Sequence, residues 1–199
     1  MDNYIYIIAG LPDLRPDWKA PEDFSADRLV EEIKSQCSSR DCETIGFLLK
    51  GFDADSLCAD FYKSALSHKE EFIREYFRYD LGVRNTKVHF INKSLGRPME
   101  QDIVDIPEAE LGEKAARVEA AFSNSDLLVR EKAVDDLMWE HIDSLTQFKY
   151  FEFTVILAFI AKLKIVDRWL KLDPETGRRM FMDLVAEIRG TFKGVEFDN

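Results

Sequence analysis

The chain repeats amphipathic segments separated by short polar breaks, a pattern typical of a protein built from helices. Apolar residues recur every three or four positions, as they do along one face of an α-helix. This spacing predicts helices at 22–35, 41–51, 55–66, 72–97, 107–122, 126–145, 148–172 and 173–192. Only 9 glycines and 6 prolines are present, few for an all-β chain with many tight turns. We therefore expect a single all-α domain over residues 1–199, a multi-helix bundle of about seven to eight helices.

Segment 148–172 differs from the other predicted helices because it has almost no polar face. Between Phe153 and Ala161 it is apolar all round. A helix of this composition lies in the buried centre of a bundle, where neighbouring helices cover every side. We expect the other helices to pack around it.

Two segments interrupt the helical pattern. Residues 4–9 form an apolar run before Gly10, too short to decide between a strand and an extended segment. Residues 99–105 form an expected acidic loop, where the chain could divide into lobes 1–98 and 106–199. A weak repeat would make these lobes two related helical units, although helical spacing alone can produce such matches. The matched pairs are Phe77 with Phe151, Leu81 with Val155, Ile91 with Ile165, and Leu95 with Trp169.

Segment 72–97 carries the main contradiction in the chain, an arginine within an apolar face. The apolar face consists of Phe77, Leu81, Val88, Ile91 and Leu95. Arg84 falls in the middle of this face when the segment is drawn as a helix. Asp80 lies one turn earlier, the spacing of an ion pair within a helix. We interpret Asp80 and Arg84 as a half-buried structural pair, with a binding role for Arg84 as the alternative.

The same segment is a candidate surface for an acidic partner. From Arg84 to Arg97 it contains four cations and no carboxylate, in a protein of net charge −11. The candidate contacts are Asn85, Lys87, Lys93 and Arg97. Asn85 and Asn92 would lie on one flank and could donate to carbonyl groups at the end of a partner helix.

Composition restricts the compartment and the class of partner. The net charge of −11 argues against nucleic-acid binding, which needs a broadly cationic face. Cys37, Cys42 and Cys58 contain no CxxC pair and fit a reducing compartment, with Cys58 in the core. No secretory signal is expected, and no apolar run is long enough to span a bilayer. We expect a cytoplasmic protein, peripheral to a membrane at most.

No motif in the chain predicts catalysis. Nucleophile-elbow, P-loop, dinucleotide-binding and HExxH patterns are all missing from the sequence. His68, His89 and His141 are far apart, and Asp135 and Asp136 fit the solvated face of a helix. We expect no catalytic residue, no cofactor and no metal, while a small enzyme with an unrecognised pocket is the minor alternative.

Three stretches resemble a known family: NYIYIIAGLPDL near the start, YDLGVRNTKVHFINKSLGR in the middle, and FEFTVILAFIAKLKIVDRWLKLDPETGRRMFMDLVAEI near the end. The chain looks like an uncharacterised bacterial family, a domain of unknown function whose genes accompany V-type ATP synthase genes. That family is distantly similar to the C-type (d-type) subunit of V-type ATPases. The residues that carry the pattern are Tyr79, Asp80, Asn85, Lys87 and Arg97, then Lys164, Asp167, Arg168 and Trp169.

The resemblance implies an all-helical, non-enzymatic subunit or accessory protein of a V-type ATP synthase. Proteins similar to the d-type subunit sit on the membrane rotor ring and receive the central stalk, so stalk or rotor-ring subunits are the implied partners. This chain is much shorter than those proteins and need not make all of their contacts. A stand-alone helical adaptor or regulatory protein-binding module, using the same basic stretch, is the alternative.

Overall fold

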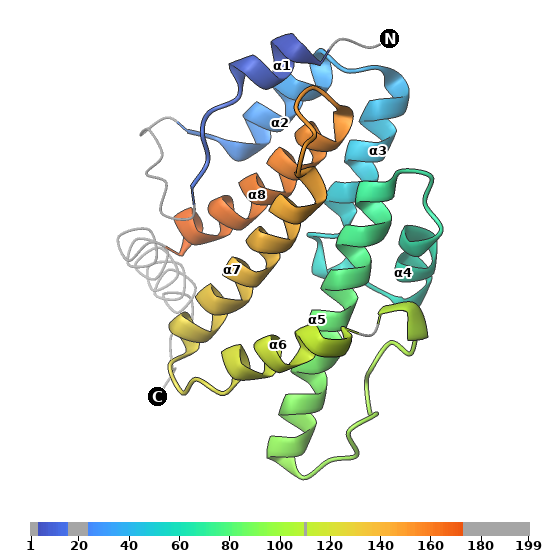
Figure 1. The fold of residues 1–199 in the computed structure, drawn as a ribbon, viewed down its shortest axis with the longest axis vertical. Helices are drawn as coiled ribbons and strands as arrows, with labels where there is room; N and C mark the ends of the chain where they lie inside the picture. Colours follow the sequence, from blue (N-terminus) through green and yellow to red (C-terminus); the bar gives the residue numbers. More distant parts are fainter. Residues whose placement is uncertain (1–3, 16–23, 110, 173–199) are drawn as a thin grey trace, which may run out of the picture.

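The computed structural model describes residues 4–15, 24–109 and 111–172. Within these ranges the chain forms eight α-helices and no strand, which confirms the predicted all-α bundle (Figure 1). The α-helices are α1 Ile5–Gly10, α2 Ala26–Ser35, α3 Ser39–Lys50, α4 Ala59–Leu66, α5 Glu71–Leu95, α6 Ala115–Phe122, α7 Leu127–Thr146 and α8 Phe153–Lys171. Three short 3₁₀ turns accompany them, η1 Ala54–Ser56, η2 Pro107–Ala109 and η3 Gly112–Lys114.

Helix α8 forms the centre of the fold, as its apolar sequence predicts. Every side chain over residues 156–161 is buried. Helices α1, α2, α3, α5 and α7 all pack against α8. Figure 1 shows α7 and α8 side by side as an antiparallel pair. The division into lobes 1–98 and 106–199 and the internal repeat stay predictions.

Polar residues at helix starts explain where two of the helices begin. Ser38 caps α3 by accepting a hydrogen bond from the Asp41 N–H, and Asp41 in turn accepts from the Ser38 N–H. The sequence suggested Asp41 as the cap, but it is the reciprocal member of a capping box. The cap of α7 is Asp126, which accepts from Leu128 and Val129, within the turn where a cap was predicted.

The N-terminal expectation of a strand or extended segment is wrong, because residues 5–10 form helix α1. A strand needs a partner strand for its backbone groups, and the described ranges contain none. A helix satisfies these groups internally while Ile7 enters the core. The ring of Tyr4 lies 5.6 Å from that of Phe153, which holds this end of the chain against α8.

Some predicted helix limits also differ from the structure. The helix expected over 107–122 begins at Ala115, because Gly112 has a left-handed φ of 56° that breaks the segment into two 3₁₀ turns before α6. The helix expected over 55–66 begins at Ala59 and follows η1. The helix expected over 22–35 begins at Ala26, after a Ser25 cap. The helix predicted over 173–192 lies outside the described residues.

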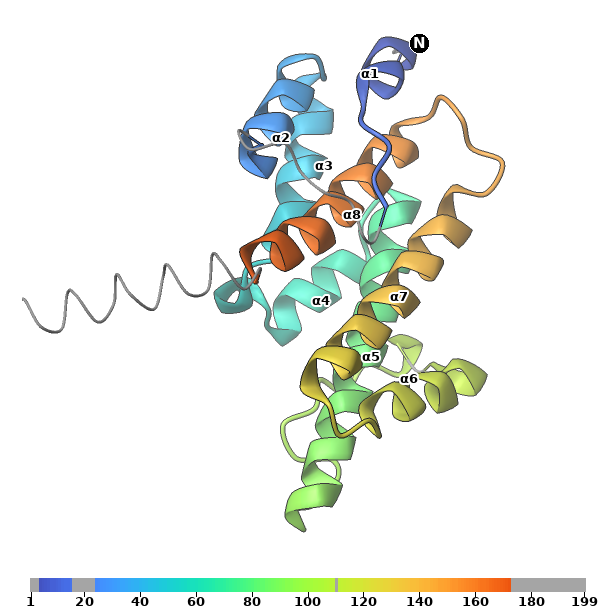
Figure 2. The same ribbon diagram turned by 90° about the vertical axis from the view of Figure 1, so that its left-hand side faces the viewer.

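Helix α5 extends beyond the other helices at one end of the molecule. Figures 1 and 2 both show its last turns projecting past α6 and α7, while α1 lies at the opposite end. The helix stops at Gly96, which takes the left-handed conformation that favours glycine at this position. No helix in the described ranges combines the length and the apolar character that crossing a membrane requires.

Candidate functional site

Helix α5 has a buried half and an exposed half, and this division defines the candidate site. Phe77 and Leu81 in the first half are buried in the core, as predicted. Ile91 and Leu95 belong to the same predicted apolar face, but their side chains are 40% and 58% exposed. The expectation of one continuous buried face is therefore wrong, because the neighbouring helices end before α5 does (Figure 2).

Arg84 lies at the rim of the core and pairs with Asp80. Its Nε donates to Asp80 Oδ2 at 2.7 Å, and the Tyr62 hydroxyl donates to the same oxygen at 2.7 Å. The Arg84 side chain is 46% exposed, whereas that of Asp80 is 13% exposed. Burial and the nearby Asp80 charge raise the pKa of Tyr62, so its phenol stays a donor. The predicted pair is present, but the carboxylate is its buried member.

The two asparagines of α5 bind a neighbouring loop of the same chain. Asn85 Nδ2 donates to the Val104 carbonyl at 2.9 Å, and Asn85 Oδ1 accepts from the Val104 N–H at 3.1 Å. Asn92 Nδ2 donates to the Gln101 carbonyl at 2.7 Å. Together they hold the segment after Gly96 along α5. Asn85, predicted as a partner contact, therefore has its amide occupied within the chain.

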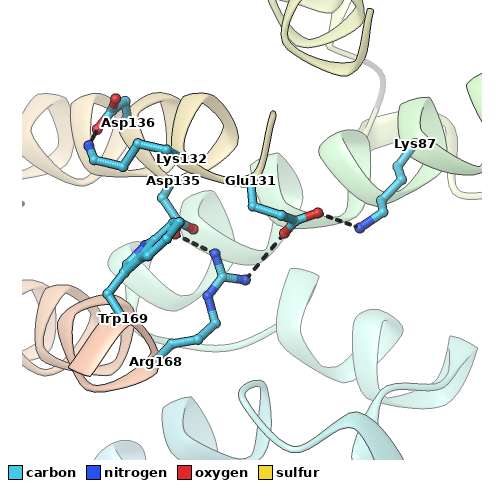
Figure 3. Close-up of polar contacts among 7 residues, drawn as sticks. All are labelled: Lys87, Glu131, Lys132, Asp135, Asp136, Arg168 and Trp169. Carbon is cyan, nitrogen blue, oxygen red and sulfur yellow. Dashed lines mark hydrogen bonds and ion pairs between the residues drawn. The ribbon is translucent and has the colours of Figure 1, made fainter. Parts of the chain in front are cut away.

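Lys87 joins a charge network that connects α5, α7 and α8. Lys87 Nζ lies 3.2 Å from Glu131 Oε1, and Glu131 Oε2 lies 3.6 Å from Arg168 Nη1. Arg168 also pairs with Asp135, which accepts from Trp169 Nε1 at 2.5 Å. Figure 3 shows Glu131 between the cations of α5 and α8. We call Lys87, Glu131, Asp135, Arg168 and Trp169 the α7 network.

The α7 network brings together the two parts of the sequence that carry the family pattern. Lys87 comes from the central stretch, while Arg168 and Trp169 come from the late one. Neither stretch contains the carboxylates that join them, because Glu131 and Asp135 lie on α7. The late stretch therefore has a structural role in holding α8 to α7. Asp167, in the same stretch, makes a local pair with Lys171 at 2.8 Å.

Asp135 is buried, which corrects the expectation that it lies on a solvated face. Its exposed fraction is 7%. Burial raises the pKa of Asp135, and the charge of Arg168 and the hydrogen bonds from Trp169 and Arg168 oppose this shift. Its position three residues before Met138 and seven before Ile142 places it on the apolar face of α7. That spacing is the signal that could have identified it.

The exposed end of α5 carries the two predicted contacts that have no ion pair within the described ranges. We call residues 91–99 the α5 tip. Lys93 and Arg97 are exposed there, among the exposed apolar side chains of Ile91, Leu95 and Met99. Both cations are therefore available to a partner, whereas Lys87 is not.

A groove of about 500 Å³ runs beside the α5 tip. Phe90 and Met99 contribute apolar surface, and Lys93 and Glu119 contribute charge. His89 also lines the groove, and its Nε2 is buried without a hydrogen-bond partner in the described structure. Such a nitrogen is costly to bury unless something satisfies it. The groove thus combines apolar surface, a cation and an unused polar atom.

The cysteines and the remaining polar residues suggest no further reactive site. Cys58 is exposed at the start of α4, so its predicted place in the core is wrong. Burial raises the pKa of Cys37 to about 11, and the charge of Asp41 adds to this effect, so the thiol stays protonated at neutral pH. Within the described residues, no three potential metal ligands gather at one place.

Comparison with known proteins places the chain in a family. A search of curated proteins and a search of solved structures find no match. A family model described as "Protein of unknown function (DUF2764)" matches residues 53–191, well over half of the chain. The matched region contains the α5 tip and the whole α7 network. This confirms the expected membership in an uncharacterised family. The chain belongs to the DUF2764 family of proteins of unknown function.

Proposed function

We propose that this protein is a non-enzymatic subunit or accessory protein of a V-type ATP synthase or ATPase, similar to the d-type subunit. In this role it links the central stalk and the membrane rotor from the cytoplasmic side. It has no active site of its own and acts as a rigid helical body. The resemblance of the three sequence stretches supplies the identity of the complex, and the α5 tip supplies the surface that meets the partner.

The observation that carries the proposal is the projection of the α5 tip beyond the bundle. Lys93 and Arg97 stand there as exposed cations without an ion pair among the described residues. Exposed Ile91, Leu95 and Met99 surround them with apolar surface. A cationic surface with an apolar centre suits an acidic amphipathic helix, because charge steers the encounter and apolar burial holds the complex.

The groove beside the tip extends this surface. It offers Phe90 and Met99 to an apolar side chain, and His89 Nε2 to a polar group of the partner. The asparagine contacts hold the loop that forms one side of the tip, so the surface is largely ordered before binding. A preformed surface loses less conformational entropy when a partner binds.

The test is purification of the tagged full-length protein from cells that express the complete V-type ATPase. We expect stalk or rotor-ring subunits to co-purify at low salt, with recovery falling as salt screens the contact. The double variant Lys93→Glu and Arg97→Glu should lose most of this recovery, at least about tenfold, because each reversal replaces attraction with repulsion. Unfolding by urea should differ from wild type by only about 0.5 kcal/mol.

The matched control reverses two exposed arginines far from the tip, Arg28→Glu and Arg40→Glu. This control changes the net charge equally and should keep the co-purifying subunits. Recovery of the wild-type protein alone at low salt would refute the proposal, as would a Lys93 and Arg97 variant that retains the subunits. If the variant instead loses a partner unrelated to the ATPase, the stand-alone adaptor is the correct function, since the same tip serves that role.

A further inference from the structure

A second cleft lies between α5, α7 and α8, apart from the α5 tip. Its volume is about 250 Å³, enough for a small ion and its immediate surroundings. The cations that line it are Arg84, Lys87, Lys164 and Arg168. The carboxylates that line it are Asp80, Glu131 and Asp135. The cleft therefore keeps one positive charge in a protein of net charge −11.

Several donors in this cleft have no partner within the described residues. Arg84 donates only through Nε, so both of its Nη groups are free. Tyr76 is 3% exposed and lines the cleft, yet its hydroxyl makes no hydrogen bond there. A buried hydroxyl normally has a partner, because leaving it unsatisfied costs about 1–3 kcal/mol. The free Tyr76 hydroxyl therefore indicates a missing ligand.

The carboxylates in the cleft leave two acceptor positions beside these donors. Asp80 uses Oδ2 for both Arg84 and Tyr62, and no described residue donates to its Oδ1. Asp135 likewise uses Oδ2, for Arg168 and Trp169. Both oxygens of Glu131 have cationic partners. The group that completes the cleft must accept from Arg84 and Tyr76 and also donate a proton.

We propose that this cleft binds a phosphate group, either free phosphate or the phosphate of a small monoester. The Arg84 Nη groups and the Tyr76 hydroxyl donate to its anionic oxygens, as guanidinium groups commonly do. A protonated phosphate oxygen donates to a free carboxylate oxygen of Asp80 or Asp135. Sulfate offers the same charge but no proton at neutral pH, so it fits less well. This site is independent of the proposed partner contact at the α5 tip.

Phosphate in the cleft would contact residues of α5 while the α7 network holds α8 nearby. A ligand that binds only the folded protein raises its stability in proportion to the logarithm of ligand concentration over Kd. The binding can therefore be followed by the thermal unfolding midpoint of the full-length protein and by calorimetric titration. Sodium chloride should hold ionic strength constant, because screening alone also changes stability.

With inorganic phosphate, we expect saturable binding and a rising unfolding midpoint, and with sulfate at least about a tenfold weaker effect, the weight of one hydrogen bond to a charged group. Tyr76→Phe keeps the buried ring and removes only the hydroxyl, so it should weaken phosphate binding about tenfold or more. Tyr79→Phe is the matched control. It removes a hydroxyl from a buried tyrosine of the same helix that does not line this cleft, and should bind phosphate as wild type does.

Glycerol 3-phosphate distinguishes the two sources of the phosphate group. Tighter binding of the ester would assign the cleft to a phosphomonoester, and tighter binding of inorganic phosphate would assign it to the free ion. The proposal is overturned if neither compound binds saturably below about 10 mM, roughly the affinity of a few weak hydrogen bonds. It is also overturned if Tyr76→Phe and Tyr79→Phe bind phosphate equally well.

Discussion

Asp135 and Asp136 show how much two adjacent residues of the same type can differ. Asp135 faces Arg168 and Trp169 in the interior, whereas Asp136 pairs with Lys132 on the surface (Figure 3). Successive residues on a helix point about 100° apart, so one can enter the core while the next meets water. The same chemical group therefore has two separate energetic roles.

Replacing these two residues tests the difference directly. Asp135→Ala should lower the free energy of unfolding by about 2–4 kcal/mol, because Trp169 Nε1 loses its acceptor and Arg168 loses its inner partner. The loss stays below that for a fully buried pair because Arg168 is partly exposed and keeps Glu131. Asp136→Ala should change it by no more than about 0.5 kcal/mol. Urea unfolding of both variants measures this, and equal effects would contradict the assignment.

At the scale of elements, α5 is held by a close approach that helix propensity alone does not predict. Gly82 lies in the middle of α5, where glycine costs about 1 kcal/mol relative to alanine. A Cβ built on Gly82 would lie 2.6 Å from the Ala109 carbonyl oxygen and equally near the Leu111 side chain. The glycine is therefore required because η2 and the residues after it pack directly on the helix backbone.

A comparison of two glycines isolates this packing effect. Gly82→Ala should lower the free energy of unfolding by about 1–3 kcal/mol, since the added methyl displaces Ala109 and Leu111. Gly46→Ala in α3 should raise it by about 0.5–1 kcal/mol, because a Cβ there meets nothing within 4 Å. Denaturant titration gives both values. A stabilising Gly82→Ala substitution would show that α5 does not approach η2 this closely.

At the scale of the whole molecule, His141 connects α7 to α5 in the neutral form. Its Nε2 lies 3.1 Å from the Glu75 carbonyl oxygen, which assigns the proton to Nε2. Its Nδ1 is buried without a partner in the described structure, and the ring stacks on Tyr79 at 4.2 Å. Burial lowers the pKa of His141 below its ordinary value of about 6.5.

This pKa shift makes stability depend on pH. Above about pH 6.5 His141 is neutral in both states, and its contribution is fully present. As the pH falls below that value, the unfolded chain binds a proton before the folded protein does, so the free energy of unfolding decreases. His141→Gln, which cannot titrate, should show a smaller decrease between pH 7 and about pH 5. Urea unfolding across this range measures it.

His68 provides the control for the pH experiment. Burial lowers its pKa too, so His141→Gln should keep part of the pH dependence. A double variant with His68→Gln should be flatter than either single variant. Identical pH profiles for wild type and His141→Gln would contradict the buried neutral imidazole.

Much of the fold follows from local patterns in the sequence. The spacing of apolar residues identified the course of α7 and α8, and the apolar run of α8 predicted its central position. Helix limits were less predictable, because Gly112 breaks the segment before α6 and the N-terminal run becomes helical where it packs on α8. These outcomes depend on backbone conformation and on neighbours that periodicity does not describe.

The candidate site divides in the same way. Asp80 and Arg84 form the predicted pair because both lie on one helix, four residues apart. Asn85 and Lys87 were predicted as partner contacts, but the loop at Val104 and the distant Glu131 occupy them. Their own segment contains no sign of these partners, because the partners are brought near only by folding.

The sequence by itself determined the helical class, the buried centre and the ion pair within α5, since these depend on residues a few positions apart. Only the tertiary structure decided that α5 is buried along its first half and exposed along its second. It also decided that the carboxylates of α7 bridge α5 to α8. The physical reason is that burial and long-range charge pairing depend on where neighbouring helices end, and a local pattern does not contain that distance.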